Sequence, residues 1–176
     1  MGLDDAQAIG SVPPGRGLVL GLDPGRDKIG FAIVELDGEL CLSGLFPTRD
    51  IDLVRVALTC GETLDDALSP WTIERPSPAA DGKVVLVALG DGTSSAALDR
   101  ELRAHLPWRM VRVDEHGTTL AARSLYWRLR RPPPWKRLLP RALWIPPRPL
   151  DDMAAWSIAL RAIDASASSP DGRYDI

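Results

Sequence analysis

Cysteine is scarce in this chain, and long apolar runs are missing from it. The 176 residues include two cysteines, Cys41 and Cys60, whose spacing matches no metal-binding motif, so we expect a reducing, cytoplasmic setting. No apolar run approaches the roughly 18 residues that span a bilayer, and we therefore expect no membrane partner. The first residues carry acidic side chains where a secretory signal needs positive charge. We expect residues 1–17 to form a disordered leader.

Acidic residues are absent from one segment, residues 121–149, although the whole chain has a net charge of −3. That segment holds eight basic residues, whereas residues 1–120 hold nineteen acidic and eleven basic ones. A locally basic segment is a candidate electrostatic footprint for phosphate. A solvated loop rich in arginine is the alternative interpretation.

The chain has 45% hydrophobic and 26% charged residues, which is typical of a globular domain. Its turn signals and apolar patterns predict three antiparallel strands followed by alternating helices and strands, which make an α/β domain with a mixed five-stranded sheet flanked by helices. The expected strands are 18–22, 29–35, 40–46, 83–89 and 109–113, and the expected helices lie within 50–68, 96–105, 118–129 and 151–163. We place the domain at 18–165, with a basic insert rich in Pro and Trp at 130–149 and a flexible tail at 166–176.

Three carboxylates fall at element ends that such a sheet brings to one edge. Asp23 ends the first strand, Glu115 follows the fifth, and Asp151 starts the last helix. Ligands bind at the carboxyl ends of parallel strands, so we expect the three to converge there. Crowded carboxylates need a compensating cation, and their oxygens suit Mg²⁺ or Mn²⁺. Two such ions can activate water and support the leaving oxygen in phosphodiester cleavage.

Each of these carboxylates also has an ordinary structural explanation. Asp23 is explained equally well as a turn residue, Glu115 as a surface residue, and Asp151 or Asp152 as a helix cap. Three unrelated coincidences at one edge are needed to explain all of them this way, which favours the metal site. Asp152 lies about 100° around the helix from Asp151 and is the second-ranked ligand.

Four more side chains near these acids are candidates. Asp91 follows the fourth strand, and His116 is placed to assist proton transfer or to contact phosphate. Arg26 and Lys28 lie in the turn after Asp23, where they suit substrate phosphates. The alternative for Asp91 is a turn residue, and the alternative for His116 is a loop histidine without a catalytic role. Arg26 and Lys28 are alternatively explained as cations that balance neighbouring acids.

Tryptophans alternate with the basic residues of the insert. Aromatic faces between cations suit stacking on unpaired bases, and the alternative is that they fasten an irregular loop to the domain. The candidate nucleic-acid contacts in the basic segment 121–149 are Arg123, Arg130, Arg131, Trp135, Lys136 and Arg137.

Three motifs together resemble one known family. GLDPGRDKIGFAIVE, VDEHGTTLAARSLYW and LDDMAAWSIAL resemble, in order, the three acidic motifs of the YqgF (RuvX) family, in the RuvC-like branch of the ribonuclease H superfamily. These are Holliday junction resolvase-like and pre-16S rRNA-processing nucleases, and the resemblance runs from about residue 18 to residue 163. It implies a ribonuclease H-like sheet of order 3-2-1-4-5, with Asp23, Glu115 and Asp151 as metal ligands. The long insert and the ALGDGTSS end of the fourth strand depart from the family pattern and bear on substrate preference.

The leading hypothesis is therefore a nuclease that uses Mg²⁺ or Mn²⁺ to cleave RNA, or branched or single-stranded DNA, with RNA favoured; the resemblance also makes a homodimer one expected assembly. A second hypothesis is a nucleic-acid-binding module on the same fold with weak catalysis, for example in ribosome biogenesis. A third comes from the Asp-x-Gly turn, which also cradles phosphate in sugar kinases, actin and chaperone ATPases. Those proteins close two such domains around a nucleotide, whereas this chain has one.

Overall fold

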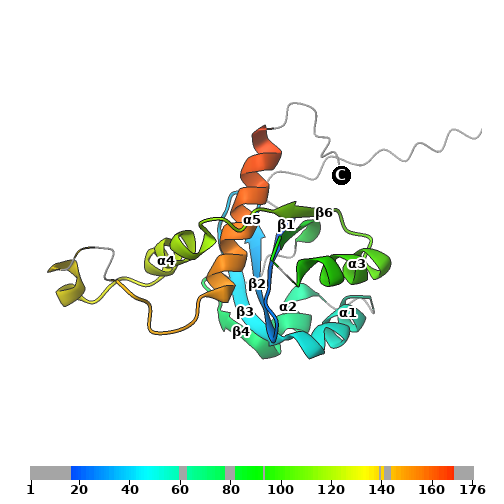
Figure 1. Ribbon diagram of the computed structural model, residues 1–176, viewed down its shortest axis with the longest axis horizontal. Coiled ribbons are helices and arrows are strands. Elements are labelled where there is room, and N and C mark those ends of the chain that lie inside the picture. The colour runs from blue at the N-terminus through cyan, green and yellow to red at the C-terminus, as the bar shows by residue number, and fades with distance from the viewer. Residues whose placement is uncertain are drawn as a thin grey trace, which may run out of the picture.

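A six-stranded mixed sheet forms the centre of the protein, with helices on both faces (Figure 1). The structure is a computed structural model that describes residues 17–59, 63–77, 82–92, 94–138, 140 and 144–168. The strands are β1 (Gly17–Pro24), β2 (Lys28–Glu35), β3 (Leu40–Pro47), β4 (Thr72–Glu74), β5 (Lys83–Gly90) and β6 (Met110–Val113). Among the described residues, no helix is long and apolar enough to cross a membrane.

The strand order is β4-β3-β2-β1-β5-β6. Strands β1 to β4 pair antiparallel, and β1, β5 and β6 run parallel to one another. This is the α/β, ribonuclease H-like topology, and it confirms the predicted order of the first five strands. The prediction of five strands is corrected by β4, which adds an edge strand beside β3. Its three residues lie between Pro70 and Pro76 and are too few to show an alternating pattern.

Alternation along β1 sends its side chains into two separate cores. Leu18, Leu20 and Leu22 pack on the face covered by α1 (Ile51–Thr59), α2 (Leu64–Leu68) and α3 (Ser95–His105). Val19 packs on the opposite face, under α4 (Thr118–Leu129) and α5 (Asp151–Ser168). Because side chains alternate with a period of two, Asp23 shares the face of Val19 and therefore faces α5. Short 3-10 helices complete the fold: η1 (Thr48–Asp50), η2 (Ser69–Trp71) and η3 (Pro134–Leu138).

The first strand and the last helix of the described chain extend slightly beyond residues 18–165. Gly17 already belongs to β1, and α5 continues to Ser168, three residues into the predicted tail. Residues 1–16 and 169–176 lie outside the described part of the chain. In Figure 1, α4 lies beside α5, and the chain that follows α4 leads away from the sheet to η3. η3 therefore stands apart from both cores.

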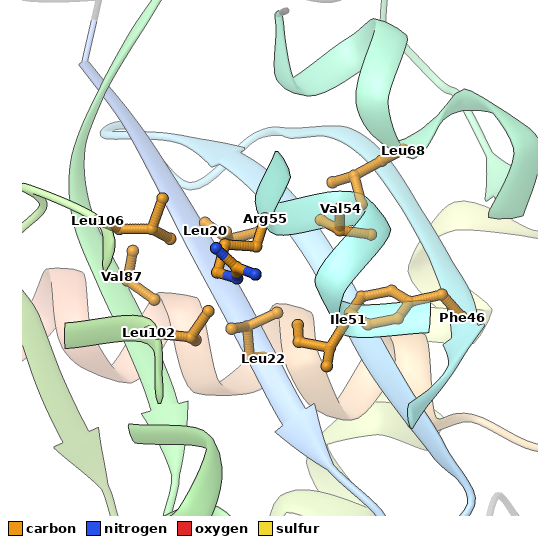
Figure 2. Close-up of a pocket in the computed structure, with 10 residues that line it drawn as sticks. All are labelled: Leu20, Leu22, Phe46, Ile51, Val54, Arg55, Leu68, Val87, Leu102 and Leu106. Carbon is orange, nitrogen blue, oxygen red and sulfur yellow. The ribbon is translucent and has the colours of Figure 1, made fainter. Parts of the chain in front are cut away.

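The first core contains a small apolar cavity of about 20 Å³ between β1, β5 and the three helices on that face (Figure 2). Leucines and Val87 line it, and the stem of Arg55 closes one side while its guanidinium binds Asp52. The space is about that of one water molecule, and apolar walls offer such a water no hydrogen-bond partners. It is a packing gap in the core and not a ligand site.

Two glycines let α5 lie directly against the sheet. A Cβ added at Gly21 would come within 2.2 Å of the Ala155 carbonyl oxygen, and one at Gly30 within 2.2 Å of the Asp151 carbonyl oxygen. No side chain fits at either position without moving helix backbone. This contact sets the first turn of α5 over β1 and β2, beside Asp23.

We expect Gly30→Ala to lower the free energy of unfolding by about 1–3 kcal/mol, the usual cost of overpacking a core. Gly17→Ala is the matched control, because its added Cβ meets the tip of the Leu36 side chain, which is partly exposed and can rotate away. Urea unfolding of both variants measures the difference. Equal losses of unfolding free energy in the two variants would contradict the close packing of the α5 backbone against Gly30.

Candidate functional site

Asp23 lies at the rim of the sheet where β1, β5 and β6 end. The pKa of its carboxyl is raised to about 7, first by burial and then by the charges of Glu115 and Asp151, against the opposing effect of Lys28. Each of the two other predicted ligands is therefore close enough to act on Asp23 electrostatically. The structure brings the three predicted carboxylates to one rim, where the charges of Glu115 and Asp151 disfavour ionisation of Asp23.

Glu115 follows β6 and reaches toward the loop that follows β5. Its Oε1 accepts a hydrogen bond from the Gly92 N–H at 3.1 Å, and a Cβ at Gly90 would lie 2.0 Å from the same oxygen. The glycines of the Gly-Asp-Gly sequence thus leave the space that the glutamate occupies. Asp91 accepts a hydrogen bond from the Glu115 N–H at 3.0 Å, so it holds the Glu115 backbone.

Asp151 begins α5 and forms an ion pair with Lys28, the first residue of β2. Lys28 Nζ lies 2.6 Å from Asp151 Oδ2, and both side chains stay partly exposed. The lysine neutralises part of the negative charge of the rim. Its position, next to both Asp23 and Asp151, agrees with the alternative interpretation of a balancing cation as well as with a phosphate contact.

Asp152 turns into the protein and is fully buried. Its two oxygens accept hydrogen bonds from Arg148 at 2.7 and 2.9 Å, and Oδ2 also accepts one from Ser43 Oγ at 3.1 Å. Consecutive helix residues point about 100° apart, which separates Asp152 from its neighbour at the rim. In this structure Asp152 belongs to a buried ion pair, and the second-ranked ligand does not join the three carboxylates.

The donor chemistry of the rim fits a hard divalent cation, because it consists of carboxylate oxygens with unbalanced negative charge. Glycines 90 and 92 also leave the space beside Glu115 that a side chain would fill. Within the described ranges, no three His, Cys, Asp or Glu side chains stand together as a metal-binding cluster. The rim therefore supplies suitable ligands without holding them in a preassembled cage.

His116 is exposed, and its backbone is held firmly. Its N–H donates to Asp114 Oδ1 at 2.7 Å, and its carbonyl accepts from Arg161 at 2.8 Å. These contacts fix the loop that carries Glu115. Among the described residues the His116 ring has no recorded partner, so its proposed role in proton transfer stays a prediction.

The candidate nucleic-acid contacts of the basic segment 121–149 divide into exposed residues and one that is paired within the protein. Arg123 and Arg131 are exposed, and so is Trp135, at 59% of its surface. Arg130, by contrast, binds Glu74 of β4 through two hydrogen bonds of 3.0 and 2.8 Å. The side chains of Lys136 and Arg137 lie outside what the structure describes.

The two ends of the insert meet at one carboxylate, which sequence reasoning missed. Arg130 at its start and Arg148 near its end both bind Glu74, the latter at 3.1 Å. Trp127 of α4 adds a further tie, because its Nε1 donates to the Trp144 carbonyl at 2.8 Å. Trp127 and Trp144 thus fasten the insert, as the alternative interpretation holds.

No protein-family model matches this chain, and no curated protein is significantly similar to it. The topology of the sheet is therefore what relates the protein to known folds, and that topology is ribonuclease H-like.

Proposed function

We propose that the protein is a divalent-metal-dependent nuclease that hydrolyses phosphodiester bonds in RNA or in branched or single-stranded DNA. The observation that supports this proposal is the rim itself: the charges of Glu115 and Asp151 both disfavour ionisation of Asp23, where parallel strands of a ribonuclease H-like sheet end beside the start of α5. A bound divalent cation would remove this electrostatic cost and stabilise the ionised carboxylates. The resemblance of the three acidic motifs to the YqgF family supports the same choice.

A bound Mg²⁺ or Mn²⁺ would neutralise the rim and lower the pKa of a coordinated water. The protein supplies the remaining parts. Asp23, Glu115 and Asp151 would hold the ions, and the Gly92 N–H orients the Glu115 carboxylate. Lys28 lies close to Asp23, and the exposed Arg26 lies in the turn that follows Asp23. Cations there would stabilise the negative charge that grows on a phosphate under attack.

A second candidate function is binding of nucleic acid without efficient cleavage. It is favoured by the ion pair of Asp151 with Lys28, which satisfies one of the proposed ligands without metal. The exposed Arg131 and Trp135 serve this function as well as they serve a nuclease. RNA binding that survives removal of all three acids would distinguish it.

The test is a substrate panel of structured RNA, single-stranded RNA, single-stranded DNA and a four-way DNA junction, incubated with Mn²⁺, Mg²⁺ or EDTA. We expect cleavage of at least one substrate with metal and none with EDTA, and we expect Glu115→Gln to lose it. Glu39→Gln is the matched control, because Glu39 is exposed in the β2–β3 hairpin at the opposite end of the sheet. Tight binding with no cleavage of any substrate would leave the binding module as the function.

A further inference from the structure

An open groove of about 670 Å³ lies beside the rim and is lined by one of its three carboxylates, Asp151. Its other walls come from the β1–β2 turn with Lys28 (residues 25–28), the end of β3 (residues 45–47) and Arg49 of η1. We propose that this groove binds the phosphates of a nucleic-acid strand that enters the rim, with Arg26 and Arg49 as its cationic contacts. The choice of a nucleic acid as ligand rests on the proposed function.

The charge of the groove suits a phosphate backbone. Three cations line it, Arg26, Lys28 and Arg49, against the two acids Asp27 and Asp151, although the chain as a whole is negative. Lys28 is held by Asp151, but the Arg49 side chain is 85% exposed and makes only a long ion pair of 3.7 Å, with Asp50. Arg26 is also exposed and makes no ion pair within the described residues. Two guanidinium groups are therefore available to a ligand.

The backbone that carries these arginines is fixed. The Thr48 N–H donates to the Asp27 carbonyl at 3.0 Å, and Lys28 pairs with Pro47 across β2 and β3. Gly25 makes the turn tight, since a Cβ there would lie 2.6 Å from the Lys28 carbonyl oxygen. The turn and the start of η1 are thus one supported wall, and only the side chains need to adjust to a ligand.

The side chains of the groove are suited to bind the phosphate backbone of a nucleic acid and not its bases. Guanidinium groups match phosphate oxygens with paired hydrogen bonds. Phe46 is fully buried, so the groove presents no aromatic face for a base to stack on. Contacts to phosphate carry no sequence information. We therefore infer binding that holds a strand in place beside the rim without reading its sequence. Arg49 was not found from the sequence, because it is far in the chain from the acidic motifs.

Salt-dependent binding in EDTA tests this inference without cleavage. The anisotropy of labelled oligo(U), oligo(A) and oligo(dT) gives the slope of log K against log [salt] for the wild type and for Arg49→Ala and Arg26→Ala/Arg49→Ala. Each lost phosphate contact should reduce the slope by about 0.7 for a single strand, equally for all three oligonucleotides. Arg49→Lys should keep most of the slope. Arg112→Ala is the matched control, because Arg112 is an exposed arginine on the edge strand β6, paired with Asp99.

Unchanged slopes in both arginine variants would overturn the inference, and so would the absence of wild-type binding at low salt. Arg49 is highly exposed, so its variants are expected to unfold at the wild-type temperature and the comparison stays valid. Failure of the nuclease proposal looks different: reduced slopes with no cleavage in the substrate panel would support the groove and leave the rim without catalysis. Cleavage with unchanged slopes would support the nuclease proposal and overturn the groove as the phosphate-binding site.

Discussion

Asp23→Asn is expected to stabilise the metal-free protein at pH 8 and, at the same time, to remove metal-dependent cleavage. In the folded protein the pKa of Asp23 is raised from 3.8 to about 7, first by burial and then by Glu115 and Asp151. The folded state therefore holds a proton that the unfolded state releases, and Asp23 lowers stability progressively as the pH rises from about 4 to about 7. Above that range the whole cost is present, and asparagine removes it.

We expect the gain at pH 8 to be about 2 kcal/mol. A pKa difference is worth about 1.4 kcal/mol per unit, and we discount the full value because Asp23 keeps partial contact with water. At pH 4 and below the variant should match the wild type. The cleavage rate should fall by more than about 100-fold, since loss of even an outer partner of a metal ligand costs about 10- to 100-fold.

Thermal unfolding of both proteins at pH 4 and pH 8, in EDTA and in Mn²⁺, measures these effects together. Mn²⁺ should raise the unfolding temperature of the wild type, because it binds only the folded state, and should raise that of Asp23→Asn much less. Asp37→Asn is the matched control, since Asp37 is exposed in the β2–β3 hairpin, where asparagine also suits the turn. A variant that is no more stable than the wild type at pH 8 would contradict the repulsion at the rim.

Local patterns were sufficient to predict the elements whose ends form the rim. The apolar runs of β1, β2 and β5 predict buried strands, and the Asp37-Gly38 turn predicts the hairpin that joins β2 to β3. Once β1, β5 and β6 are parallel, their ends fall at the same edge, which brings Asp23 and Glu115 together. The helical step of 100° also separates Asp151 from Asp152 correctly. The strands, the turn and the helical step depend on neighbours within a few residues, whereas the pairing of β1 with β5 joins distant segments of the chain, and the strand order was implied by the family resemblance.

The contacts that complete the site join residues far apart in the chain. No periodic pattern in the sequence predicts such contacts. Lys28 and Asp151 are 123 positions apart, and Arg130 and Glu74 are 56 apart. The sequence around Arg130 does not indicate that its side chain binds a carboxylate. The partner, Glu74, lies on the edge strand β4, which is itself too short to predict. Arg130 therefore fits equally well as a phosphate contact and as an anchor until the fold is known.

Removing Arg148 is expected to cause the largest loss of stability in the chain. Its guanidinium binds both oxygens of Asp152, which is fully buried, and one oxygen of Glu74, whose side chain is 9% exposed. Arg148→Met leaves the Asp152 carboxylate buried without a counterion. Breaking such a pair from one side costs about 3–5 kcal/mol, and we expect urea unfolding to show a loss of this size.

Two variants separate this explanation from a general loss of packing. Arg128→Met removes an arginine of α4 whose ion pair with Glu39 is exposed on both sides, and it should cost at most about 1 kcal/mol. Adding Asp152→Asn to Arg148→Met removes the orphaned charge while keeping a polar group for Ser43 Oγ. The double variant should recover part of the lost stability. If it is less stable than Arg148→Met alone, the buried charge is not the cause.

The pH dependence of stability below about pH 4.5 gives an independent check on the ion pair between Arg148 and Glu74. Burial raises the pKa of Glu74, but hydrogen bonds from Arg130 and Arg148 outweigh it and hold the pKa below its ordinary value of 4.5. This carboxylate therefore contributes stability above about pH 4.5 that is lost as the pH falls through the lower folded value. Arg148→Met should weaken that dependence, while the loss from Asp23 between pH 4 and 7 stays unchanged. The two carboxylates act on stability with opposite signs, so their contributions can be separated in one pH series.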